Sequence, residues 1–156
     1  MIMNTYLMEI LGNKILITGV VSWIISQILK TIIHLVVNHK IVMERLMGDG
    51  GMPSSHSATV ASVATATGIH CGLGSPEFAI ALFMAIIVMH DARGVRRETG
   101  KQAVVINNMV EWFVELGNSD MTPEETLKEF VGHTPMQVLA GGLLGVIVAC
   151  IVNLII

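Results

Sequence analysis

Three long apolar runs constrain this chain more than any other feature. Residues 15–37, 76–92 and 135–156 are almost wholly apolar, and each reaches the roughly 17–25 residues that an α-helix needs to cross the hydrocarbon core of a bilayer. Only 13% of the 156 residues are charged, about half the share of roughly 25% that is usual in soluble domains. The runs therefore predict a helical integral membrane protein and exclude an ordinary soluble domain.

A fourth run, over residues 56–72, is only weakly apolar and is rich in Ala, Ser, Thr and Gly. Membrane helices use such small residues where their backbones approach closely, so this run is expected to be a span buried among the other three. No internal repeat or linker interrupts the chain, and residues 1–156 are expected to form one domain. The predicted fold class is an all-α membrane bundle with four spans near 15–37, 56–72, 76–92 and 135–155.

The third and fourth spans are separated by a long polar segment. Within it, residues 103–116 have the pattern of an amphipathic helix that lies against the bundle or the membrane interface. The sequence 122-TPEE-125 is a helix start signal, and it predicts a short helix over 123–131. Together these form a predicted helical insertion.

The basic residues are distributed unevenly about the predicted spans. Of the nine Lys and Arg residues, only Lys14 falls on the side of the termini. Loops on the cytoplasmic side of a membrane carry an excess of Lys and Arg, so the loops 38–55 and 93–134 are expected in the cytoplasm, with the protein in the plasma membrane. The residues on that side are Lys30, Lys40, Arg45, Arg93, Arg96, Arg97, Lys101 and Lys128.

Polar residues interrupt the second half of the first span. Gln27, Lys30 and His34 are three and four residues apart and share one helix face, which Trp23 continues. A polar stripe on a membrane helix faces the protein interior or a watery cavity. For Lys30 alone, an alternative is that its ammonium extends to the membrane interface.

Two helix starts are expected at the same membrane face. The sequence 50-GGMPSSHSA-58 precedes the second span and 133-HTP-135 precedes the last. Ser54 before a helix is also an ordinary N-cap signal, and arginines beside spans are ordinary topology determinants. Helix N-termini offer free N–H groups to anions, and arginine favours phosphate, so the convergence of these features indicates a phosphate site.

An ordered set of motifs resembles the divergent type-2 phosphatidic acid phosphatase family, small membrane proteins related to lipid phosphatases and vanadium haloperoxidases. The motifs are GGMPSSHSA at 50–58, DARGVRR at 91–97, GKQA at 100–103 and GHTP at 132–135, and the resemblance covers nearly the whole chain. It implies a helical membrane phosphatase that works without a metal or other cofactor.

The resemblance also implies roles for single residues. Pro53-Ser54-Ser55-His56 resembles the Pro-Ser-Gly-His motif of the wider superfamily, with Ser55 in place of Gly. His56 would then be the general acid, and His133 the nucleophile that forms a phosphohistidine. Asp91 is a third catalytic candidate, as a carboxylate that could orient His133. The predicted substrate-binding residues are Lys30, Arg45, Ser54, Ser55, Arg93, Arg96, Arg97, Lys101 and Gln137.

The chain departs from the superfamily pattern in three places. No Arg-Pro follows Lys30 at the spacing of the first motif, so Lys30 and Arg45 are stand-ins. The third motif is split by the insertion, and the residue four positions after His133 is Gln137 instead of Asp. A carboxylate there would orient the imidazole and stabilise its cation, whereas Gln137 can orient it without adding charge. Asp91 is the first alternative source of that carboxylate.

The leading functional hypothesis is hydrolysis of a lipid phosphomonoester or diphosphate through a phosphohistidine. One alternative is a Mg²⁺-dependent lipid phosphotransferase that uses Asp49, Asp91 and Glu98 as oxygen ligands. The other is a non-catalytic membrane protein that retains the phosphate site, which Gln137 favours. The expected partners are a membrane lipid phosphate and the bilayer, with no nucleic acid, and a homo-oligomer is left open.

Overall fold

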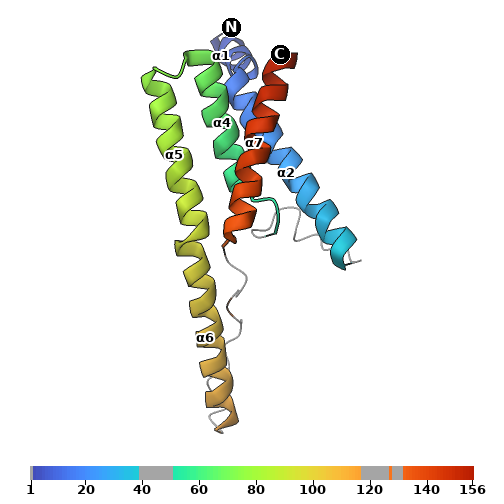
Figure 1. Cartoon of the computed structure of the whole chain (residues 1–156), viewed down its shortest axis with the longest axis vertical. Helices are drawn as coiled ribbons and strands as arrows, with labels where there is room; N and C mark the ends of the chain where they lie inside the picture. The colour runs from blue at the N-terminus through green and yellow to red at the C-terminus, as the bar shows by residue number, and fades with distance from the viewer. Residues whose placement is uncertain (1, 39–50, 117–126, 128–131) are drawn as a thin grey trace.

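The computed structural model of the chain describes residues 2–38, 51–116, 127 and 132–156 (Figure 1). Every regular element among these residues is an α-helix, which confirms the predicted all-α class. The helices are α1 (Ile2–Leu11), α2 (Lys14–Asn38), α4 (Ser55–Cys71), α5 (Pro76–Arg93), α6 (Val95–Glu115) and α7 (Pro135–Ile155).

Helix α4 is the centre of the bundle, and α2, α5 and α7 all pack against it (Figure 1). Its buried residues are almost all Ala, Ser, Thr and Gly, so the prediction that the weakly apolar run lies among the other three is confirmed. Three helical stretches are long and apolar enough to cross a membrane: Lys14–Val37, Pro76–Glu115 and Pro135–Ile155. Helix α4 has 17 residues, or about 26 Å at 1.5 Å per residue, and does not belong to that set.

The α4–α7 contact is a close backbone crossing that depends on two glycines of α7. A Cβ atom at Gly141 would lie 2.3 Å from the carbonyl oxygen of Ser54, and one at Gly145 would lie 2.2 Å from that of Ala58. Small residues four apart are a common device for bringing membrane helices together. These two glycines therefore set the distance between α4 and α7.

Helix α2 presents a polar face to the bundle. Ser22 Oγ donates a hydrogen bond to the carbonyl of Ala58 across the helix pair, at 3.0 Å. Gln27 and Lys30 are buried, as predicted. Because Lys30 is only 2% exposed, its ammonium does not extend to the membrane interface, which was the alternative for this residue. Trp23, predicted on the same face, is 43% exposed. At this level of α2 the residue that contacts α4 is Ser22, whose hydroxyl reaches the Ala58 carbonyl.

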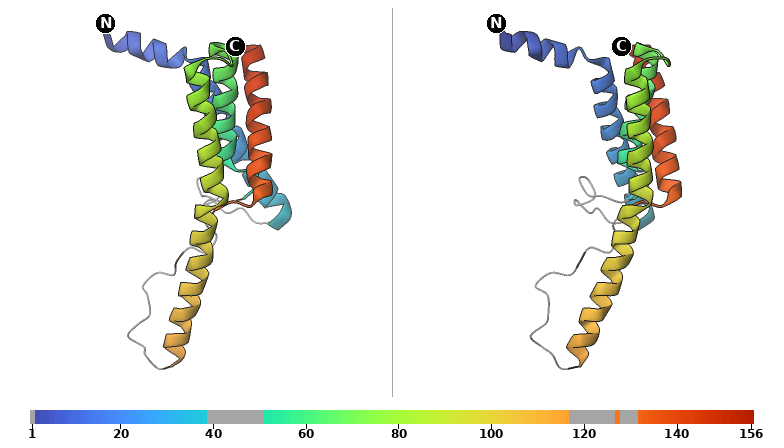
Figure 2. Two further views of the ribbon diagram at one scale, coloured as in Figure 1. Left: turned by 60° about the vertical axis from the view of Figure 1, so that its left-hand side comes forward. Right: turned by 90° about the vertical axis from the view of Figure 1, so that its left-hand side faces the viewer.

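Helix α6 continues from α5 through Gly94 and projects beyond the bundle (Figures 1 and 2). The predicted amphipathic helix is therefore present, but it begins at Val95 instead of residue 103. Among the helices that the structure describes, it packs only against α5, so the half of the prediction that placed it against the bundle is wrong. The physical reason is that the chain makes no reversal at Gly94, and the axis of α5 carries α6 away. The interfacial alternative stays a prediction.

The combined length of α5 and α6 exceeds one bilayer. The stretch Pro76–Glu115 has 40 residues, or about 60 Å of helix, twice the roughly 30 Å of a hydrocarbon core. The side chain of Asn107 on α6 makes two hydrogen bonds with the backbone of Leu127. Its Nδ2 donates to the Leu127 carbonyl at 2.9 Å, and its Oδ1 accepts from the Leu127 N–H at 3.1 Å. The rest of the short helix predicted over 123–131 lies outside the described residues.

The chain direction of the helices fixes where a site can form. Helices α4 and α7 begin at the same end of the bundle, where α5 finishes (the lower end in Figure 1). The termini lie at the opposite end, where Lys14 Nζ donates to the carbonyl of Ile156 and α1 turns away from the bundle (Figure 2). The described residues thus place two helix N-termini beside one helix C-terminus.

Candidate functional site

Both helix starts carry side-chain caps. Ser54 precedes α4, and its Oγ accepts from the backbone N–H of Ser57 at 3.4 Å and from the Ser57 hydroxyl at 3.1 Å. Thr134 precedes α7 in a capping box: Thr134 Oγ1 accepts from the Gln137 N–H at 3.3 Å, and Gln137 Oε1 accepts from the Thr134 N–H at 2.9 Å. The Pro53-Ser54 and Thr134-Pro135 signals of the sequence are therefore local structural devices as well as motif residues.

Two backbone hydrogen bonds tie three helix ends together. The N–H of Ser54 donates to the carbonyl of Gln137 at 3.0 Å and links the start of α4 to the start of α7. The N–H of His133 donates to the carbonyl of Ala92 at 2.9 Å and links the segment before α7 to the end of α5. This junction holds His133 in a fixed place relative to α4.

His56 and His133 meet at this junction. Their ring centroids are 5.9 Å apart and the rings are tilted by 59°. His133 is only 3% exposed, whereas His56 is half-buried. A phosphate with a hydrogen bond of about 3 Å on each side would span roughly 10 Å. The two histidines, which are far apart in the sequence, are closer together than that distance.

Gln137 holds the buried imidazole from one side. Its Oε1 lies 3.4 Å from Nδ1 of His133, at the long end of the hydrogen-bond range, while the same oxygen accepts the Thr134 N–H. A neutral amide carbonyl can fix the ring and its tautomer. With Nδ1 facing Gln137, Nε2 is the nitrogen on the opposite edge of the ring.

Lys30 reaches the same end of the bundle from α2. A Cβ atom at Gly51 would lie 3.0 Å from both Cγ and Cδ of Lys30, so the backbone just before α4 rests on the lysine stem. Gly51 has φ +87°, a left-handed conformation that favours glycine. Gly51 was not among the predicted site residues, although the Gly50-Gly51 pair before Pro53 indicates a backbone conformation that needs glycine.

The remaining predicted residues are spread more widely. Ser55 is buried at the start of α4, and Asp91 is half-buried in the last turn of α5, next to Ala92. Arg93 is exposed at the end of α5. The position of Arg45 lies outside the described residues.

The basic residues of α6 lie progressively farther along a helix that leaves the bundle. Arg96 is in its first turn, and its side chain is outside the description; Arg97 is exposed. Lys101 Nζ forms an ion pair of 2.6 Å with Glu98, and both side chains are about 60% exposed. The structure thus brings together His56, His133 and Gln137, with Lys30 nearby, and does not bring Lys101 to them.

Comparison with known proteins agrees with this architecture. The chain is 37% identical over 152 residues to the "Uncharacterized membrane protein YuiD" of Bacillus subtilis (strain 168), a match that covers 92% of this chain and 96% of that protein. No solved structure gives a significant match. Three helical stretches long enough to cross a membrane and a relative named as a membrane protein identify an integral membrane protein. Because the sequence model of the Divergent PAP2 family matches residues 11–148, the chain belongs to that family.

Proposed function

We propose that this protein is a membrane lipid-phosphate phosphatase that works through a phosphohistidine at His133. The observation that carries the proposal is the 5.9 Å pairing of His56 with the buried His133 where two helices begin and one ends. Helix N-termini favour an anion there. Lys30 of α2 and Arg93 at the end of α5 add positive charge at this end of the bundle.

The proposed reaction has two steps. Nε2 of His133 attacks phosphorus, the bond from phosphorus to the lipid oxygen breaks, and protonated His56 gives its proton to that oxygen. Water then attacks the phosphohistidine, neutral His56 takes its proton, and cleavage of the P–N bond releases inorganic phosphate. Splitting one displacement into two in this way is covalent catalysis, and the same histidine acts first as acid and then as base.

The experiment that tests this proposal is a phosphate-release assay. Purified protein in detergent is incubated with a panel of lipid monophosphates and diphosphates in excess EDTA, and inorganic phosphate is measured. Release that survives EDTA supports the proposal. Release that appears only with added Mg²⁺ favours the metal-dependent phosphotransferase instead. Absence of release across the panel, under either condition, contradicts the proposed activity.

A second candidate function is binding of a lipid phosphate without turnover. The observation that favours it is that the imidazole of His133 is held by the neutral amide of Gln137, which gives a developing imidazolium no compensating charge. Phosphate binding by the purified protein, with no phosphate release from any lipid, would distinguish this function from the first.

The proposal extends to the membrane topology. Helix α4 lies alongside α2, α5 and α7 and is taken as a fourth span of one domain, with the histidine pair facing the cytoplasm of the plasma membrane because the basic residues gather at that end. A cysteine introduced at Asn118 should react with an impermeant maleimide only after the cells are opened. Labelling from outside intact cells would reverse the topology.

Replacing Gln137 by glutamate should raise the rate of phosphate release by roughly tenfold or more. In a well-studied protease, replacing the carboxylate partner of the catalytic histidine by an amide lowers kcat by roughly 10⁴-fold, and part of that effect is expected here in reverse. Glutamate keeps the acceptor of the capping box and adds charge beside Nδ1 of His133. The matched control is Gln137→Ala, which should release phosphate more slowly and lose about 1 kcal/mol of stability with the hydrogen bond from the Thr134 N–H. If Gln137→Glu is no faster than the parent, another acid already supplies the charge, with Asp91 the first to test.

A further inference from the structure

An apolar groove runs along the outside of the bundle between α5 and α7. Both helices pack on α4, and the space between them is an open cavity of about 630 Å³. Small side chains of α4 form its floor, and α5 and α7 form its walls. Representative lining residues are Ala61, Ala64, Leu82, Met89, Gly142 and Leu143.

Small residues lie on both walls of the groove. Outside its own helix, the described atom that a Cβ at Gly142 would meet is Met89 Sδ, at an ordinary distance of 3.6 Å. Ala85, on the facing wall, is also small. One methyl group would fit at Gly142, whereas a leucine side chain there would occupy the groove.

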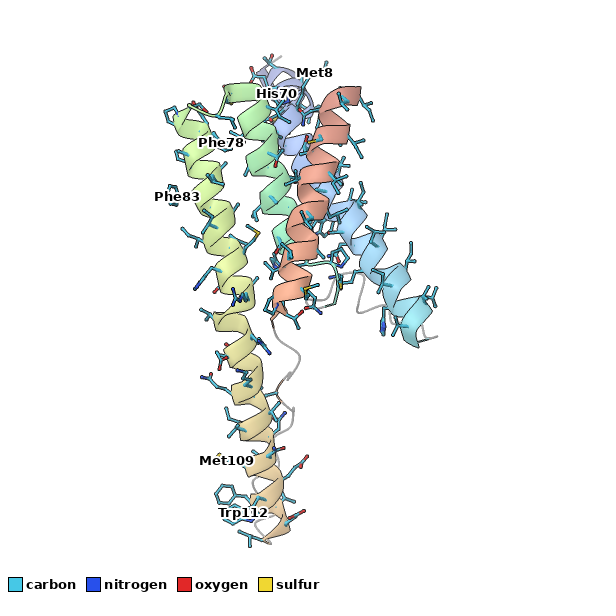
Figure 3. All side chains as sticks on the ribbon, viewed as in Figure 1. Met8, His70, Phe78, Phe83, Met109 and Trp112 are labelled. Carbon is cyan, nitrogen blue, oxygen red and sulfur yellow. The ribbon has the colours of Figure 1, made fainter. Side chains whose placement is uncertain are left out.

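The groove is at least as long as one leaflet of a bilayer is deep. At 1.5 Å per residue, its lining runs for about 17 Å on α7, from Pro135 to Val146, and for about 23 Å on α5, from Phe78 to Arg93. Half of a hydrocarbon core of roughly 30 Å is about 15 Å. Since α5 and α7 both belong to stretches able to cross a membrane, the groove opens toward lipid over about the depth of one leaflet. On α5, Phe78 marks its far end, on the side that faces α4, whereas Phe83 points away from the bundle (Figure 3).

The other end of the groove is polar and adjoins the histidine pair. His90 and Arg93 line it there, together with Pro135. Arg93 directly follows Ala92, whose carbonyl accepts the N–H of His133, and Pro135 is two residues beyond His133. An anionic group at this end would meet the Arg93 guanidinium and lie next to the proposed site of phosphoryl transfer.

We infer that this groove binds a hydrocarbon chain of an anionic lipid whose phosphate lies at the Arg93 end. The occupant is an acyl chain from the leaflet on the side of the site, because the groove is apolar for a leaflet's depth and cationic only at the end that a headgroup would reach. The inference deepens the proposed function, and it rests on that function for the identity of the phosphate-handling site.

The test uses the whole protein in phosphatidylcholine vesicles that contain a small share of a diacyl lipid phosphate with a diazirine in one acyl chain. After illumination, the labelled residues are mapped by mass spectrometry. The parent should be labelled at lining residues of α5 and α7. Gly142→Leu should cut that labelling by roughly tenfold, the scale on which an apolar pocket rejects a badly fitting group.

Two controls keep the result interpretable. Ala79→Leu adds the same side chain type at an exposed residue of α5 that does not line the groove, and it should leave the labelling unchanged. The same diazirine chain on a lipid without phosphate should label the groove less, and Arg93→Gln should remove that difference.

Three outcomes would overturn the inference. They are labelling spread evenly over the exposed faces of α5 and α7, labelling insensitive to Gly142→Leu, and cross-links between two copies of the chain through the groove. Labelling needs no turnover, so labelling of the groove without phosphate release would support lipid binding in the groove and reject the proposed phosphatase activity. Phosphate release by a protein whose groove is not labelled would support the phosphatase activity and reject lipid binding in the groove.

Discussion

Replacing Gly145 by alanine should force α4 and α7 apart and destabilise the whole bundle. The added Cβ would lie 2.2 Å from the carbonyl oxygen of Ala58 and 3.0 Å from Cβ of Ala61. The first of these is backbone in a central helix and cannot rotate away. Overpacking a core lowers the free energy of unfolding by about 1–3 kcal/mol and sometimes more. Because this clash is with backbone, we expect a loss at or above the upper end of that range. Thermal unfolding in detergent should show a large fall in Tm.

The control for this prediction lies in the same helix. Gly142→Ala adds the same methyl group three residues earlier, where the nearest described atom outside the helix is Met89 Sδ at 3.6 Å. Because alanine favours a helix over glycine by about 1 kcal/mol, this variant should be as stable as the parent or slightly more stable. Equal Tm values for Gly145→Ala and Gly142→Ala would mean that α4 and α7 do not cross as closely as described.

Replacing His133 by alanine should abolish phosphate release and leave the fold intact. Loss of the nucleophile in a well-studied protease costs about 2 × 10⁶ in kcat, so a fall of at least roughly 10³-fold is expected here. The bundle should survive because the hydrogen bond to Ala92 comes from the His133 backbone. The matched control is His70→Ala, an exposed histidine near the opposite end of α4 (Figure 3), which should release phosphate at the parent rate. A parent-like rate for His133→Ala would show that the nucleophile is wrongly assigned.

The helices were predictable because their signals are local. Apolar length located α2, α5 and α7, and a capping hydroxyl followed by proline fixed the start of α5 at Pro76 and of α7 at Pro135. The small-residue composition of α4 predicted that it is surrounded. The spacing of Gly141 and Gly145 was also present in the sequence, and it would have predicted the α4–α7 crossing.

The direction of α6 and the details of the site depend on contacts that the sequence does not encode locally. A glycine at position 94 is compatible with a reversal or with a continued helix, and only packing decides between them. Alternating directions of the helices predict that His56 and His133 lie at one end. That Gln137 Oε1 serves both the cap and the His133 ring follows from the tertiary junction of α4, α5 and α7.

The most direct measurement is to trap the covalent intermediate. The protein is mixed with a lipid phosphate that carries a radiolabelled phosphoryl group, quenched in alkali to preserve phosphohistidine, and digested, and the labelled peptide is identified. The proposed mechanism predicts label on His133, none in His133→Ala, and loss of the label with time as phosphate appears. Release of inorganic phosphate with no label on His133 at any time, or with label on another residue, would contradict it.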